Sequence, residues 1–136
     1  MKTVLVIEDN MFVRENIAEM LMLANYKVLK AENGKAGIEQ ALQQKPDIVV
    51  CDIMMPLMDG YAVLQEFKKA PELEDIPFVF LSAKSKSENI REGIEAGADD
   101  YITKPFQESE LLNAVKGGLL NINEQHKQTR RPYRQG

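Results

Sequence analysis

The 136-residue sequence contains a single cysteine, no tryptophan and no long hydrophobic run. One cysteine, Cys51, excludes an internal disulfide and is typical of a reducing cytosol, so we expect a cytoplasmic protein. The apolar runs extend over only a few residues, whereas a transmembrane helix needs about 20. The apolar run at the N-terminus is too short for a signal peptide. We therefore expect neither a membrane span nor export.

Acidic side chains outnumber basic ones in most of the chain. The net charge is −4, and residues 121–136 carry four cationic side chains and one acidic side chain, which leaves −7 for the residues before them. An acidic body is not expected to bind nucleic acid. The tail is too short for a separate DNA-binding domain. We expect residues 1–120 to form one domain, and residues 121–136 to be a polar, basic tail or the stump of a linker.

Short apolar runs alternate with amphipathic segments along the chain. Apolar residues at helical spacing follow each run, and in the second such segment Ile38, Ala41 and Leu42 are expected to share the buried face. Five βα units of this kind predict an α/β fold, a five-stranded parallel sheet with helices on both faces. The runs that predict strands are residues 3–7, 27–31, 48–51, 78–81 and 100–103.

Polar residues follow four of the predicted strands. Glu8 and Asp9 follow the first strand, and Asp52 follows the third. Ser82 and Lys104 stand at the ends of the fourth and fifth. Because the carboxyl ends of parallel strands meet at one edge of the sheet, we expect these five side chains to lie close together.

Three acids crowded at one edge repel each other, and a hard divalent cation would relieve the repulsion. Mg²⁺ prefers a few carboxylates, several waters and phosphate oxygens. We expect Asp9 and Asp52 to bind Mg²⁺ directly, Glu8 to bind it through water, and the backbone carbonyl of Met54 to supply another oxygen. Such a site stays open to a phosphoryl group.

Asp52 is also the candidate nucleophile of this site. Phosphoryl transfer depends chiefly on alignment and charge neutralisation, so a carboxylate is a competent acceptor. The Lys104 ammonium would neutralise the incoming oxygens, and the Ser82 hydroxyl would donate a hydrogen bond to them. The expected product is an aspartyl phosphate.

Together these residues resemble the CheY-like receiver domains of bacterial two-component response regulators, over about residues 3–120. Each motif is weak alone, but their order, each at a strand end, is highly specific. The motifs are Glu8-Asp9, Asp52 with Pro56 and Gly60 downstream, Ser82-Ala83, and Lys104-Pro105-Phe106.

The resemblance implies a flavodoxin-like fold with strand order 2-1-3-4-5 and often a cis bond before Pro105. It implies Mg²⁺-dependent phosphorylation of Asp52 by a sensor histidine kinase or a histidine phosphotransfer domain. It also implies a switch, in which Ser82 moves toward the phosphate and Tyr101 turns inward. The face made by the fourth helix, fifth strand and fifth helix would then change and bind an output partner, and dimerisation through this face is common in the family.

The same resemblance implies roles for four further residues. Met54 and Lys84 flank the route of water to the phosphorylated acid in the family, so an apolar Met54 is expected to slow hydrolysis. Met11 and Phe12 lie in the region that receives the phosphohistidine domain, although they could equally pack in the core.

Simpler roles exist for several of these residues. Glu8 or Asp9 alone could cap a helix, as could Ser82. Tyr101 could be a half-buried aromatic side chain with a solvated hydroxyl. Asp59, which precedes a turn glycine, is expected to be structural.

Rival functions also remain open. A phosphatase with an aspartate nucleophile would need a second acid and a cap, and no insertion is large enough for a cap. A flavin-binding module would need loops rich in glycine or hydroxyl groups, whereas three acids repel a phosphate unless a metal intervenes. An interaction module that is never phosphorylated is the third rival. We expect a phosphoryl acceptor and not an enzyme with multiple turnover.

Overall fold

The structure is a computed structural model that describes residues 1–127, with side chains described as far as residue 120. The basic tail predicted for residues 121–136 therefore falls largely outside the described residues. The last helix continues to Lys127, so it runs past the expected boundary at residue 120. The position of that boundary stays a prediction.

Five strands alternate with five helices in the described residues, as the sequence predicts. The strands are β1 (Thr3–Ile7), β2 (Lys27–Ala31), β3 (Ile48–Asp52), β4 (Phe78–Ser82) and β5 (Asp100–Thr103). The helices are α1 (Met11–Leu23), α2 (Gly34–Gln43), α3 (Gly60–Lys69), α4 (Ser87–Glu95) and α5 (Glu108–Lys127).

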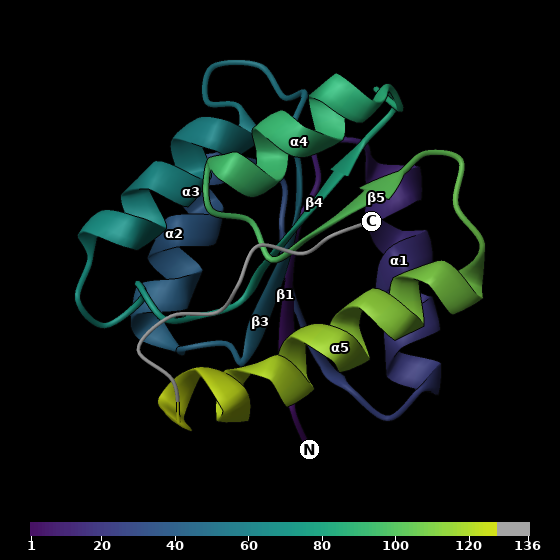
Figure 1. The fold of residues 1–136 in the computed structure, drawn as a ribbon. Coiled ribbons are helices and arrows are strands. Elements are labelled where there is room, and N and C mark those ends of the chain that lie inside the picture. The colour runs from purple at the N-terminus through teal and green to yellow at the C-terminus, as the bar shows by residue number, and fades with distance from the viewer. Residues whose placement is uncertain (128–136) are drawn as a thin grey trace.

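The strands form one parallel sheet in the order β2-β1-β3-β4-β5, which confirms the predicted flavodoxin-like fold. Helices α1 and α5 cover one face of the sheet, and α2, α3 and α4 cover the other (Figure 1). The three inner strands β1, β3 and β4 are buried along their whole length. Their continuous apolar runs follow from having helices on both sides.

Two hydrophobic cores lie on opposite faces of the sheet. Val4 and Val6 pack in the core with α1 and α5, whereas Leu5 and Ile7 pack in the core with α2 and α3. Successive side chains of a strand point to opposite faces, so one five-residue strand serves both cores. This double burial fixes each strand's register and therefore the positions of the residues at its end.

Side chains at the carboxyl edge of the sheet cap the helices that follow. The carboxamide oxygen of Asn10 accepts a hydrogen bond from the Val13 N–H at 3.0 Å at the start of α1. Asp59 has the expected structural role, because its Oδ1 accepts from the Ala62 N–H at 2.9 Å at the start of α3. Such caps fix where each helix begins. Among the described residues, no helix combines the length and apolar character needed to cross a membrane.

Candidate functional site

Three carboxylates meet at the ends of β1 and β3. One oxygen from each of Glu8, Asp9 and Asp52 lies within 4.8 Å of the other two. Glu8 and Asp52 are buried, whereas Asp9 is exposed. The fold therefore brings the predicted acids together in a cluster that is closed on the sheet side and open to solvent at Asp9.

Lys104 reaches this cluster from the loop after β5. Its Nζ donates a hydrogen bond to Glu8 Oε1 at 3.0 Å and lies 3.4 Å from Asp52 Oδ1. The second oxygen of Glu8 accepts from the Asn10 N–H at 3.0 Å. The Lys104-Pro105 peptide bond is cis, as the resemblance implies. Glu8 thus has protein partners on both oxygens, and Asp52 remains the more available carboxylate.

Burial dominates the electrostatics of the cluster. It raises the pKa of Asp52, and the Lys104 ammonium only partly offsets this effect. Burial also raises the pKa of Glu8, against hydrogen bonds from the Asn10 backbone and Lys104. Burial acts to lower the pKa of Lys104, but the hydrogen bond to Glu8 and the charge of Asp52 outweigh it and raise that pKa. Burial makes the charged form of these carboxylates unfavourable, and a bound cation would stabilise it. Their oxygens are the ligands that Mg²⁺ prefers.

A close backbone contact holds the loop after Asp52 in place. The Gly60 N–H donates to the Ile53 carbonyl at 2.8 Å. A Cβ atom at Gly60 would lie 2.7 Å from the Asp52 carbonyl oxygen and 2.7 Å from the Ile53 Cα, so only glycine fits there. The start of α3 is therefore pressed against the end of β3, which explains the spacing of Asp52 and Gly60.

Ser82 lies fully buried at the end of β4, next to β3. Its Oγ accepts a hydrogen bond from the Lys84 N–H at 3.1 Å. The N-cap of α4 is Lys86, so the alternative that Ser82 caps this helix is wrong. The hydroxyl is instead tied to the loop between β4 and α4.

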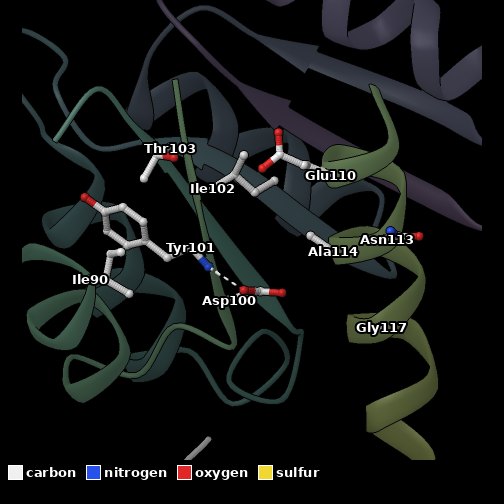
Figure 2. A pocket seen from close by; sticks show the side chains of 9 residues that line it. All are labelled: Ile90, Asp100, Tyr101, Ile102, Thr103, Glu110, Asn113, Ala114 and Gly117. Carbon is white, nitrogen blue, oxygen red and sulfur yellow. Dashed lines mark hydrogen bonds between the residues drawn. The ribbon is translucent and has the colours of Figure 1, made fainter. Parts of the chain in front are cut away.

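Tyr101 joins the same loop to β5. Its hydroxyl donates to the Lys84 carbonyl at 2.9 Å, and its ring is half-buried with its centroid 6.5 Å from that of Phe80. Figure 2 shows the ring beside Ile90 of α4, with the hydroxyl directed away from α5. A groove of about 470 Å³ lies along β5 between α4 and α5, with Ile90 on one side and Asn113 on the other. The ring is thus half-buried, as the simpler alternative has it, and the hydroxyl is in addition bonded to the loop.

Met54 and Lys84 line one cavity of about 550 Å³ beside the loop after β3. The Met54 side chain is 57% exposed, and the role of its backbone carbonyl stays a prediction. Tyr61 and Glu92 line the same cavity, and burial, followed by the charge of Glu92, raises the pKa of Tyr61 to about 12. The sequence did not point to this pair, because Tyr61 belongs to the apolar repeat of α3 and its partner lies on another helix.

Met11 and Phe12 are 55% and 77% exposed at the start of α1. The alternative that they pack in the core is therefore wrong for this pair. Only Asn10 separates them from the Glu8-Asp9 pair in the chain, so two large apolar side chains face solvent near the acidic cluster. Exposed apolar groups at such a position suit contact with another protein.

Known proteins resemble this chain in sequence and in fold. Residues 4–116 match the model of the response regulator receiver domain. The phosphate regulon transcriptional regulatory protein PhoB of Pseudomonas aeruginosa is 39% identical over 118 residues, which cover 87% of this chain and 52% of the relative. The regulator RpaA of Synechocystis is 34% identical over 88% of this chain and 49% of its own length. The chain thus spans about half the length of these curated relatives.

Solved structures agree with the sequence comparison. The signal receiver domain of a signal transduction histidine kinase from Syntrophus aciditrophicus is 31% identical, with a TM-score of 0.81 over 89% of this chain and 92% of that one. The chemotaxis protein CheY4 of Vibrio cholerae is 26% identical, with a TM-score of 0.83 over 88% and 99%. The chain belongs to the family of response regulator receiver domains.

Proposed function

We propose that this receiver domain is a phosphorylation-dependent switch in which Asp52 accepts a phosphoryl group. The donor is the phosphohistidine of a sensor histidine kinase or of a histidine phosphotransfer domain. The observation that carries the proposal is the position of Asp52. Its side chain is buried, its Oδ1 lies 3.4 Å from the Lys104 Nζ, and two further acids lie beside it. This arrangement places a fixed cation beside Asp52, whereas both oxygens of Glu8 already have protein partners.

The reaction transfers the phosphoryl group without net oxidation. A carboxylate oxygen of Asp52 bonds to phosphorus as the phosphorus–nitrogen bond of the phosphohistidine breaks, and the electron pair stays on the imidazole nitrogen, which then binds a proton. Lys104 neutralises the phosphoryl oxygens, and the Ser82 hydroxyl donates a hydrogen bond to one of them. These groups act by position and charge, which is the main requirement of phosphoryl transfer.

Receiver domains generally bind Mg²⁺, and the acidic cluster fits this ion. Asp9 and Asp52 would hold it directly and Glu8 through water. Bound Mg²⁺ supplies neutralisation of the charge on the phosphoryl oxygens. The exposed position of Asp9 leaves room for waters and for the incoming phosphoryl group.

The readout of phosphorylation is a change of the face made by α4, β5 and α5. Ser82 bonds to the Lys84 backbone, and the Lys84 carbonyl accepts from Tyr101, so movement at Ser82 changes the setting of Tyr101. We expect an output protein, or a second copy of the chain, to bind this face in one state only. Such a shift is limited by how differently the phosphate interacts with the two states.

Other parts of the proposal concern the setting of the protein. We expect it to act in the cytoplasm, where it meets the kinase. The domain itself is not expected to bind nucleic acid, because it is acidic. It forms and hydrolyses its own phosphoryl bond and does not turn over many substrate molecules.

The test uses acetyl phosphate as a small phosphodonor together with Mg²⁺, and intact-mass spectrometry as the readout. We expect one added phosphoryl group, which is lost with EDTA and in Asp52→Asn. The matched control is Asp59→Asn in the same loop, which removes a nearby charge but keeps a good N-cap and should keep the label. A label that survives Asp52→Asn, or release of many phosphates per protein molecule, would refute the proposal.

A further inference from the structure

Gly93 lies in the middle of α4, buried against the ring of Tyr101. A Cβ atom at this position would lie 2.8 Å from Cδ2 and 3.1 Å from Cε2 of Tyr101, and 3.2 Å from Cδ2 of Phe80. Real Cβ atoms essentially never come within 3.0 Å of another heavy atom. The ring of Tyr101 therefore occupies the space that any side chain at position 93 would need.

A glycine inside a helix is normally unfavourable, because it loses more backbone entropy than alanine. Gly117 of α5 is the contrasting case, because a Cβ atom there would meet no atom within 4 Å and no close neighbour requires a glycine. At Gly93 the absence of a side chain allows the backbone of α4 to pack directly on the ring of Tyr101. The absence of a side chain is thus matched to one partner, Tyr101.

We propose that Gly93 is a positioning residue that keeps Tyr101 in its inward position. By the inward position we mean the ring lying between Gly93 and Phe80 with its hydroxyl bonded to the Lys84 carbonyl. Three contacts define it: the packing on Gly93, the edge contact with Phe80 and the 2.9 Å hydrogen bond to Lys84. Added bulk at position 93 removes the first and strains the second.

The ring has an alternative place. Tyr101 also lines the groove that runs along β5 between α4 and α5, which offers about 470 Å³ (Figure 2). A methyl group at position 93 shifts the equilibrium toward this groove or pushes α4 outward. Either movement breaks or weakens the bond from Tyr101 to Lys84, and with it the link to Ser82. The consequence for signalling rests on the proposed function, but the packing itself does not.

The first test reads the position of the ring in the unphosphorylated full chain. The four tyrosines are replaced by 3-fluorotyrosine, and the ¹⁹F resonance of Tyr101 is assigned from a Tyr101→Phe variant. We expect Gly93→Ala to move this resonance toward the value of a solvent-exposed ring. The matched control Gly117→Ala adds the same methyl group on α5, where it lines the groove but contacts no ring atom in the inward position, so it should leave the resonance in place. An unchanged Tyr101 resonance in Gly93→Ala would overturn the proposal.

The second test is a double-mutant cycle on the melting temperature. Gly117→Ala should raise the melting temperature, since alanine favours the helix. Gly93→Ala should fail to raise it in the wild-type chain but should raise it once Tyr101→Ala has removed the ring. Contacting residues give such non-additive changes, whereas independent ones do not. Equal stabilisation by Gly93→Ala in both backgrounds would show that the ring does not need this glycine.

A third arm separates the inference from the proposed function. Gly93→Ala is treated with acetyl phosphate and Mg²⁺, and both the mass and the Tyr101 resonance are recorded. A phosphoryl label on Asp52 without return of the resonance to its inward value supports the positioning role. A label that restores the inward resonance fully would overturn that role. Failure to label the wild-type chain would refute the phosphorylation switch, while the first two tests would still decide the packing.

Discussion

At the scale of single residues, the site depends on charges that are unfavourable without a ligand. Asp52 and Glu8 are both buried, both have raised pKa values, and they share one ammonium group from Lys104. A protein can retain such a cluster when function requires it, because binding of a cation or a phosphoryl group then changes the energy of the whole region.

Asp52→Asn should stabilise the metal-free protein near neutral pH. The pKa of the Asp52 carboxyl is raised in the folded state, so the folded protein binds a proton at Asp52 more tightly than the unfolded chain does. Proton binding therefore stabilises the fold at low pH, and this stabilisation is lost as the pH rises through the raised pKa. Asparagine carries no charge and avoids the loss. We expect a melting temperature higher by roughly 3 °C near pH 7 in EDTA. This gain in melting temperature should disappear below pH 3.8, which is the ordinary pKa of an aspartate. Thermal melts between pH 3 and pH 7 measure it. A gain that grows as the pH is lowered would contradict the prediction.

Met54→Asn should shorten the life of the phosphorylated state. Met54 and Lys84 line the same cavity beside the site, and an amide at position 54 can orient a water that a thioether cannot. We expect hydrolysis to speed up by roughly tenfold, or about 1.4 kcal/mol in the barrier. The measurement follows loss of the phosphoryl label by intact mass after the donor is removed. Slower loss from Met54→Asn than from the wild type would contradict the role given to Met54.

At the scale of helices and strands, small residues decide how closely the layers pack. The apolar pattern predicted that Ile38, Ala41 and Leu42 share the buried face of α2, but Leu42 is 51% exposed. The face that lies on the sheet carries Gly34, Gly37 and Ala41. A hydrophobic pattern gives such residues little weight, although they allow close approach. The prediction was correct for Ala41 and wrong for Leu42 for this reason.

Asp59→Ala should weaken the start of α3. The Asp59 carboxylate accepts the Ala62 N–H at 2.9 Å, and alanine would leave this donor without its cap. We expect a loss of about 1 kcal/mol in the free energy of unfolding, whereas Asp59→Asn should cost little. Urea denaturation of the two variants measures the difference. Equal stability of the two would show that the cap does not hold the helix.

At the scale of the whole molecule, binding of Mg²⁺ should stabilise the fold. The ligands come from the loop after β1 and from the last residue of β3, so the unfolded chain cannot bring them together. A ligand that binds only the folded state adds about 2.7 kcal/mol at one hundred times its dissociation constant. Thermal melts at constant ionic strength should show a higher melting temperature with Mg²⁺ in the wild type and little change in Asp52→Asn.

The pH dependence of this stabilisation has a definite sign. Glu8 and Asp52 have raised pKa values, so protons compete with Mg²⁺ as the pH is lowered. The rise in melting temperature caused by a fixed Mg²⁺ concentration should therefore shrink on acidification. A stabilisation that is independent of pH, or that survives the loss of Asp52, would indicate that the ion binds elsewhere.

The amino-acid sequence alone determined the number of strands, their parallel arrangement and the edge at which the site lies. Buried strands require continuous runs of apolar residues, and these runs are local in the chain. The residues directly after them, Asp52 among them, are then carried to the carboxyl edge by the topology. Local patterns of this kind are readable because the physical cause acts over a few neighbouring residues.

Only the tertiary structure decided which side chains bond to one another. The hydrogen bond from Tyr101 to the Lys84 carbonyl and the packing of Gly93 on the Tyr101 ring join segments that no periodicity relates. The raised pKa values of Glu8 and Asp52 likewise come from burial by helices on both faces of the sheet. Distances and desolvation are properties of packed neighbours distant in the chain, so they become fixed only when the chain has folded.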